Sequence, residues 1–151
     1  MGSGRFLGAV TSVVGVITLE LAQDMTAAAL ARAAELGALV SVAVVDAGGH
    51  LVAFARMDGA EIAGPTLATD KAFTAVAHRI ATAELGPLTV DGGPLQGMQA
   101  NGGGRYVVFA GGLPCWEGSG SAARVVGAIG VSGGSAEEDA AIAAAGLERF
   151  V

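Results

Sequence analysis

Glycine separates the apolar segments of this chain, and the order of those segments limits the folds that it can adopt. The alanine-rich segment 19–36 contains neither glycine nor proline and stops at Gly37, which is typical of a helix closed by a glycine C-cap. After Pro65, helical spacing resumes and again stops at a glycine, Gly86. The sequence therefore predicts two long helices, over 19–36 and from Pro65 to Gly86.

The remaining apolar runs predict antiparallel strands. Two β-branched runs within 39–59 are separated by Asp46, Ala47, Gly48 and Gly49, a composition that favours a hairpin turn. The runs "RYVVFAGGLPCWEG" and "ARVVGAIGVSGG" predict a second hairpin, and "SAEEDAAIAAAGLERF" predicts a closing helix. The predicted order is helix, hairpin, helix, loop, hairpin, helix, without the strand–helix–strand alternation of parallel sheets. We therefore expect an α+β fold with helices packed on an antiparallel sheet.

Composition excludes several classes of function. The 151 residues fit one domain. The net charge is −6, whereas proteins that bind nucleic acids or anionic membranes carry a basic patch, so we exclude both partners. The stretch "FLGAVTSVVGVI" is too short to span a bilayer and lacks a clear cleavage site, so we expect a cytoplasmic protein. Only 15% of the residues are charged and 52% are hydrophobic, which favours self-association into a homo-oligomer. A single cysteine, Cys115, excludes an internal disulfide.

The stretch "GAIGVSGGSAEED" at 127–139 has the glycine content of a phosphate-binding loop but not its spacing. Ser135 and Glu138 form a capping box at a helix start. The acids of the first turn occupy the positive end of the helix and would repel a phosphate. We therefore predict a structural turn that binds no nucleotide.

Four blocks in this order resemble the signature of the GlcG/HbpS-like family: "VAVVDAGGHLVAFARMDGA", "ATDKAFTA", "AGGLP" and "GAIGVSGGSAEED". The resemblance implies a single domain over 17–151, preceded by an extra segment, 1–16. It implies a profilin-like three-layer fold, with a five-stranded antiparallel sheet flanked by helices. It also implies a homo-oligomer, with an octamer as one candidate assembly, and a haem or related tetrapyrrole ligand. The segment "LPCWEGSGSAARVVG" departs from the family pattern, because relatives have a shorter turn there.

Candidate site residues gather on the second predicted helix. Lys71, Thr74 and His78 follow at spacings of three and four, so they share one side of the helix, and Asp70 is adjacent. In one interpretation this side is a solvated face or an oligomer contact. In the other it is a ligand wall, in which Lys71 neutralises a carboxylate and His78 ligates a metal or moves a proton.

Two residues outside that helix are further ligand-binding candidates. Arg56 could grip a propionate or a small carboxylate through two hydrogen bonds, or it could form an ion pair with Asp58 or Asp70. Trp116 could stack on a flat ligand, although core packing is the simpler role for a lone tryptophan.

Two functions of different class follow. The first is a haem-binding oligomer whose pocket lies between the second helix and the Gly- and Pro-rich loop 86–104. Its iron could be held by one of a few side chains: His50, His78, Met25, Met57, Met98, Cys115 or Tyr106.

The second is a cofactor-free enzyme acting on a small carboxylate metabolite. In it, Arg56 and Lys71 would bind the anion, and His78 or Asp70 would act as general acid and base. The residues leave open whether the protein is an enzyme at all.

Overall fold

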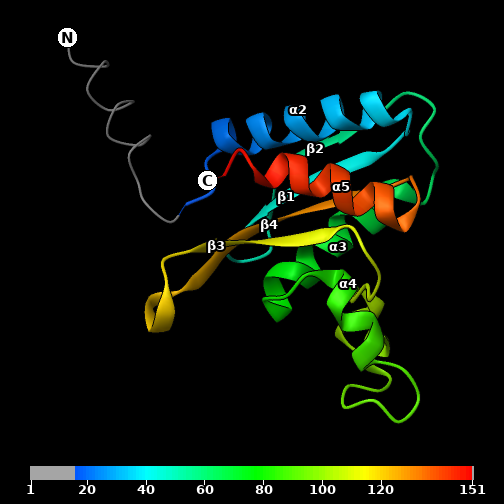
Figure 1. Ribbon diagram of the computed structural model, residues 1–151, viewed down its shortest axis with the longest axis vertical. Coiled ribbons are helices and arrows are strands. Elements are labelled where there is room, and N and C mark those ends of the chain that lie inside the picture. The colour runs from blue at the N-terminus through cyan, green and yellow to red at the C-terminus, as the bar shows by residue number, and fades with distance from the viewer. Residues whose placement is uncertain (1–15, 151) are drawn as a thin grey trace.

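The computed structural model describes residues 16–150 and contains a four-stranded antiparallel sheet with helices on both faces (Figure 1). In chain order its helices and strands are α2 (Leu19–Leu36), β1 (Ser41–Asp46), β2 (Leu51–Arg56), α3 (Gly64–His78), α4 (Thr82–Leu85), β3 (Gly112–Glu117), β4 (Arg124–Ser132) and α5 (Ala136–Leu147). Short 3-10 turns occur at Gly86–Leu88, Met98–Ala100, Gly102–Gly104 and Gly120–Ala122. The predicted extra segment 1–16 lies outside the described residues, apart from Val16.

The strand order is β2-β1-β4-β3, so β2 and β3 are the edges of the sheet. Helices α2 and α5 lie side by side on one face, and α3 lies on the other, beneath β1, β3 and β4 (Figure 1). The α+β class is confirmed, but the prediction of five strands is wrong, because the sheet formed by residues 16–150 has four. The profilin-like arrangement stays a prediction.

Helix α2 has the predicted bounds because both of its ends are capped. The Thr18 hydroxyl accepts a hydrogen bond from the Leu21 N–H at 3.1 Å. Gly37 closes the helix in the left-handed conformation, with φ 69°. Buried alanines along α2 let it pack closely on the sheet, where they join valines of β1 in the larger apolar core.

Close approach of α3 to the sheet depends on a glycine of β4. A Cβ atom at Gly130 would lie 2.0 Å from the Ala68 carbonyl oxygen and 2.6 Å from the Ala72 nitrogen. No larger residue fits there without moving the helix. This glycine belongs to the 127–139 stretch, and it serves packing, as predicted for that stretch.

The second predicted helix is interrupted. Helix α3 ends at His78, because Arg79 adopts the left-handed conformation with φ 56°, and α4 begins three residues later. The buried Thr82 hydroxyl accepts a hydrogen bond from the Gly112 N–H at 2.9 Å. The chain turns after His78 so that Thr82 can reach β3, and this tertiary bond overrides the local helical pattern.

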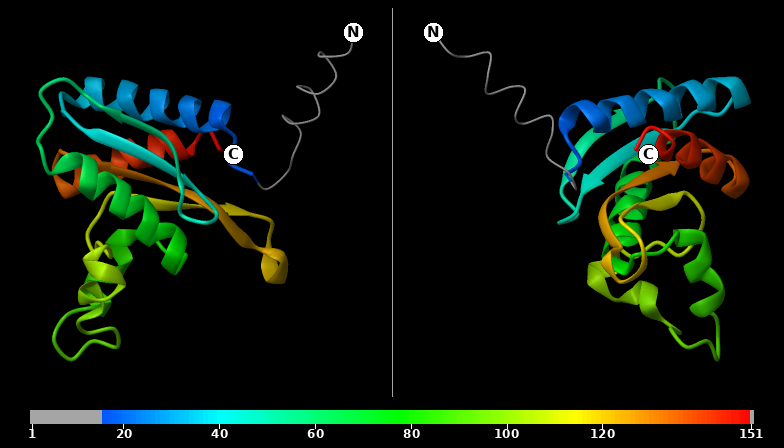
Figure 2. Two further views of the ribbon diagram at one scale, coloured as in Figure 1. Left: turned by 180° about the vertical axis from the view of Figure 1, so that it is seen from behind. Right: turned by 60° about the vertical axis from the view of Figure 1, so that its left-hand side comes forward.

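The strand predicted over 105–118 is only partly confirmed, because its first half, 105–111, is not a strand, for a similar reason. The Val107 N–H donates to the Thr74 hydroxyl at 2.9 Å, so this segment is attached to α3 rather than to the sheet. Strand β3 starts only at Gly112. Figure 2 shows the segment between α3 and β3 extending away from the sheet.

Candidate functional site

The predicted capping box at the start of α5 is confirmed, and it leads into a buried ion pair. The Glu138 N–H donates to the Ser135 hydroxyl, and the Glu138 side chain accepts from the Ser135 N–H. Asp139, the next residue, is only 4% exposed. One of its oxygens accepts from the Gly134 N–H at 2.8 Å and the other from Lys71 Nζ at 3.1 Å.

Lys71 therefore joins the two helical layers across the end of the sheet. Its side chain is 1% exposed, and Nζ also donates to the Val131 carbonyl of β4 at 2.9 Å. Nζ lies 5.0 Å from the centre of the Phe109 ring. Burial lowers the pKa of Lys71, against the attraction of Asp139, and burial raises the pKa of Asp139. The cation has its partners inside the protein.

Thr74 likewise has internal partners. Its hydroxyl accepts from the Val107 N–H and donates to the Asp70 carbonyl at 2.7 Å. Thr74 is fully buried, so this part of α3 is not the solvated face that one interpretation of the sequence described. The binding roles predicted for Lys71 and Thr74 stay predictions, and the contacts of both residues are those of packing.

His78, at the end of α3, lies in a different environment. Its Nε2 atom is buried and has no hydrogen-bond partner within residues 16–150. The ring of Tyr106 packs edge-on against the imidazole, with 4.4 Å between ring centres and an interplanar angle of 80°. Tyr106 also stacks on Phe73 at 6.3 Å. The end of α3 and the following loop thus present two aromatic rings and an imidazole together.

A positive charge borders these rings. The guanidinium of Arg105 lies 3.7 Å above the centre of the Phe73 ring, and its Nε donates to Asp70 at 3.0 Å. Arg105 keeps 42% of its side chain exposed, whereas Asp70 is 18% exposed. We call Asp70, Phe73, His78, Arg105 and Tyr106 the α3 aromatic cluster. It offers a nitrogen ligand, flat apolar surfaces and an accessible cation.

Sequence reasoning identified only part of this cluster. Asp70 and His78 were candidates from helical spacing, and Tyr106 was one of the axial possibilities. Arg105 and Phe73 were missed, because Arg105 was assigned to a strand and lies 35 residues from its partner Asp70. The glycine run 102–104 next to Arg105 was the available signal for a turn: Gly102 has φ 63°, and a Cβ atom there would lie 2.6 Å from Cζ of the Tyr106 ring.

The other candidates lie apart from the cluster. Arg56 donates to the Ala60 carbonyl, and neither Asp58 nor Asp70 pairs with it in the described part of the chain. Trp116 is 47% exposed at the β3 edge, so the expectation of core packing is wrong. Its neighbour Cys115 faces the core, where burial raises the pKa of the thiol to about 12.

These positions reduce the choice of iron ligands. Met25 and Cys115 lie in the core with no exposed surface. His50 is exposed just after the first hairpin turn, where Asp46 accepts hydrogen bonds from the Gly48 and His50 N–H groups. Among residues 16–150 there is no cluster of three or more His, Cys, Asp or Glu side chains able to hold a metal ion.

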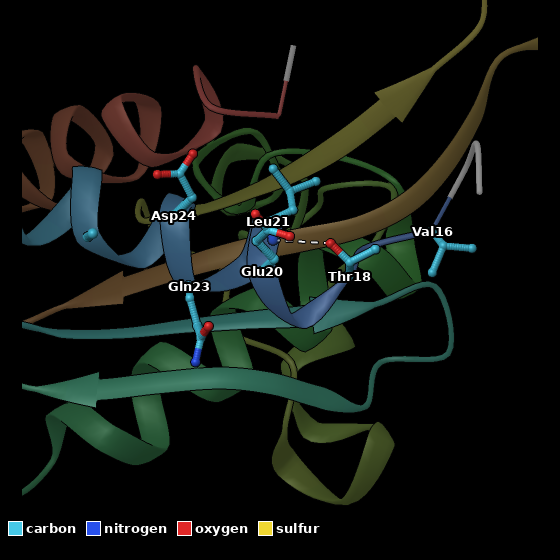
Figure 3. Close-up of a pocket in the computed structure, with 7 residues that line it drawn as sticks. Val16, Thr18, Glu20, Leu21, Gln23 and Asp24 are labelled. Carbon is cyan, nitrogen blue, oxygen red and sulfur yellow. Dashed lines mark hydrogen bonds between the residues drawn. The ribbon is translucent and has the colours of Figure 1, made fainter. Parts of the chain in front are cut away.

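A surface groove lies elsewhere, along the first turns of α2 (Figure 3). It is lined by Val16, Thr18, Glu20, Leu21, Gln23, Asp24 and Ala27. It contains none of the predicted site residues. Its charged lining residues, Glu20 and Asp24, are carboxylates, and Asp24 is paired with Arg149 of the C-terminal end.

Comparison with known proteins agrees with the sequence blocks. The family model described as "Haem degrading protein HbpS-like" matches residues 17–148. An uncharacterised 15.0 kDa protein of Citrobacter freundii is 36% identical over 137 residues, which are 91% of this chain and 94% of that protein. The crystal structure of a PduOC:haem complex has a TM-score of 0.82 and 34% identity, with 89% of this chain and 94% of that chain covered.

A longer relative contains a region like this chain. The corrinoid adenosyltransferase PduO of Citrobacter freundii is 38% identical over 120 residues, or 80% of this chain. This chain spans only 35% of that protein. Within residues 16–150, no helix is both long enough and apolar enough to cross a membrane.

Proposed function

Because this chain belongs to the HbpS-like family of haem-degrading proteins, we propose that it binds a tetrapyrrole, haem in particular, at the α3 aromatic cluster. The observation that carries the proposal is the buried Nε2 of His78, which has no partner within the described residues. An unpaired polar atom inside a protein costs stability, so its retention calls for a role. Iron coordination is a common role for imidazole.

The cluster suits the rest of a haem molecule. Tyr106 offers an aromatic ring to a planar macrocycle, and the half-exposed Arg105, which lies over the Phe73 ring, offers a cation to a propionate. Bound haem would supply redox and ligand-binding chemistry at its iron, while the protein sets the axial ligand and excludes water. Because Nε2 is buried beside Tyr106, we infer that the Tyr106 side chain moves aside to admit the ligand.

A hemin titration tests this proposal. Hemin added to the full chain should give a defined Soret band that saturates at a fixed ratio per subunit. His78→Ala should abolish or shift that band, since an axial imidazole sets the spectrum of the iron. His50→Ala is the matched control, because it removes the other histidine, which is exposed, and it should leave the band unchanged.

Two results would contradict the proposal. One is association of hemin without saturation, as occurs on many apolar surfaces, and the other is survival of the band in His78→Ala. If the protein binds a corrinoid saturably but not hemin, the ligand is a corrinoid rather than haem.

The alternative, an enzyme acting on a small carboxylate, has less support from the geometry. That mechanism needs Arg56 and Lys71 to bind the anion next to an acid or base. Lys71 is paired with Asp139 in the core, where its side chain is buried. Arg56 contacts the Ala60 carbonyl. We therefore favour ligand binding over turnover of a metabolite.

We also propose that the protein is a homo-oligomer. The low charged fraction that suggested self-association is joined by exposed apolar side chains, among them Leu51 at 52% and Phe54 at 40%. Size exclusion with light scattering should give a mass that is a multiple of the 14.7 kDa chain. A monomer at micromolar concentration would contradict this.

A further inference from the structure

The two edges of the sheet differ in whether they can accept another strand. On β3, the Gly112 N–H already donates to Thr82. Pro114, two residues later, has no N–H to offer, and successive outward positions on a strand are two residues apart. The outer edge of β3 is therefore blocked in the way that natural sheets protect their edges.

Strand β2 has none of this protection. Its sequence, LVAFAR, contains no proline or lysine, and only Arg56 is charged. Within residues 16–150, its one neighbouring strand is β1. Its Leu51 and Phe54 side chains are exposed. An apolar edge strand of this kind is a template for pairing with another strand.

The hydrogen-bond pattern shows which β2 groups face outward. The Met57 N–H donates to the Val40 carbonyl, towards β1, at 3.0 Å. The backbone N–H and C=O groups of successive residues point to opposite sides of an antiparallel strand. Those of Ala55 therefore also point towards β1, and those of Phe54 and Arg56 point away from it. A register shift opposite Val44 and Val45 ends the regular alternation near Val52. Phe54 and Arg56 are therefore the two regular outward positions.

These two positions are self-complementary. In an antiparallel pair centred on Ala55, Phe54 of each copy lies opposite Arg56 of the other. The backbone N–H and C=O groups of these two opposite residues would hydrogen-bond to each other. Phe54 and Arg56 lie on the α3 face of the sheet, because they pair with Ala43 and Ser41 of β1. Each Arg56 would therefore lie beside the Phe54 ring of the other copy, a favourable cation–aromatic contact.

We propose that β2 pairs with β2 of a second copy of this chain, antiparallel and centred on Ala55, so that two four-stranded sheets join into one. This interface rests on the proposed homo-oligomer and does not depend on haem. At the centre, Ala55 of one copy lies opposite Ala55 of the other as a non-hydrogen-bonded pair, with Cα atoms about 4.5 Å apart. The small alanine side chain permits this close approach.

Cysteine cross-linking of the full chain tests the register. Ala55→Cys should form an intermolecular disulfide under mild oxidation, because the predicted Cα separation lies within disulfide range. Leu51→Cys is the matched control on the same strand. Its sulfur would lie roughly 25 Å from that of the other copy and should not cross-link. The native Cys115 is buried and is common to both variants.

A second variant tests the same contact without cysteine chemistry. Phe54→Arg places two arginines opposite each other at two symmetric positions, and it should raise the dissociation constant of this contact by about tenfold. Trp116→Arg, on the blocked edge, should not. The proposal is overturned if Ala55→Cys stays uncross-linked or if Leu51→Cys cross-links as readily. A multimeric mass by light scattering together with either result would preserve the homo-oligomer and reject this interface.

Discussion

Two buried polar regions on α3 differ in how their hydrogen-bonding groups are used. At one, Lys71 bonds to Asp139 and to the Val131 carbonyl, so the charge joins three elements. At the other, His78 Nε2 is buried without a partner within residues 16–150. The first arrangement holds the helices and the sheet together. The second leaves one polar atom unsatisfied, at a cost of about 1–3 kcal/mol that a bound ligand would offset.

The comparison teaches that burial of a polar residue does not by itself mark a binding site. Helical spacing placed Lys71 and His78 on one side of α3, and sequence gave no reason to separate them. Only their partners distinguish a structural residue from a candidate ligand. This distinction would fail if removal of Lys71 and removal of His78 changed the stability of the protein in the same way.

The largest expected effect is on stability, from Lys71→Met. This change leaves the Asp139 carboxylate buried without its counter-ion, which should cost about 3–5 kcal/mol of unfolding free energy at pH 7. The double variant Lys71→Met, Asp139→Leu removes both charges and should recover most of that loss. Urea unfolding of both variants measures this. A loss below about 1 kcal/mol for the single variant would show that the pair is not essential to the fold.

The pH dependence of Lys71→Met sharpens the same point. Without Lys71, burial should keep the pKa of Asp139 above its value of about 3.9 in the unfolded chain. Between those two pKa values the folded state holds a proton that the unfolded state releases, so stability should rise as pH falls. Denaturation of the variant from pH 7 to pH 5 tests this against the Lys71→Met, Asp139→Leu control. A variant that loses stability relative to the control over this range would contradict the assignment.

At His78 we expect the opposite result. His78→Leu removes an unpaired polar atom, so the unfolding free energy without ligand should stay the same or rise by about 1 kcal/mol. The same urea titration gives the value. If the variant loses more than about 2 kcal/mol, the imidazole has a structural partner and the contrast with Lys71 fails.

The smallest effect is expected at the rim of the cluster. Arg105→Ala removes a half-exposed ion pair with Asp70 and a contact with Phe73, which together should contribute about 1 kcal/mol to stability. Hemin affinity should fall by about tenfold, the usual scale for one charge-assisted hydrogen bond, while the Soret position stays the same. Glu117→Ala is the control, because it removes an ion pair with Arg124 at the other end of β3, away from the cluster.

Much of the fold could be predicted from local signals. The cap at Gly37, the turn after Asp46 and the capping box at Ser135 each depend on residues within four positions, and the structure contains all three. Two of the errors, the unbroken second helix and the extension of the predicted strand over 105–111, have one cause. In both, a threonine hydroxyl binds a distant backbone N–H: Thr82 with Gly112, and Thr74 with Val107. Such long-range bonds leave no local pattern.

The candidate site was harder to predict for the same reason. Helical spacing identified His78, but the Tyr106 and Arg105 contacts depend on how the loop returns to α3. The pairing of Lys71 with Asp139 spans 68 residues and crosses from one helical layer to the other. Family resemblance supplied the ligand class, whereas only the arrangement in space separates the residues that can meet a ligand from those that hold the fold.

The most direct test of the account measures how much hemin stabilises the protein with and without His78. At a free hemin concentration about a hundredfold above the dissociation constant, the unfolding free energy of the unchanged chain should rise by about 2.7 kcal/mol. His78→Leu, folded and at least as stable without ligand, should gain almost nothing at the same concentration. Equal stabilisation of the two proteins, or none of either, would contradict the assignment of His78 as the residue that holds the iron.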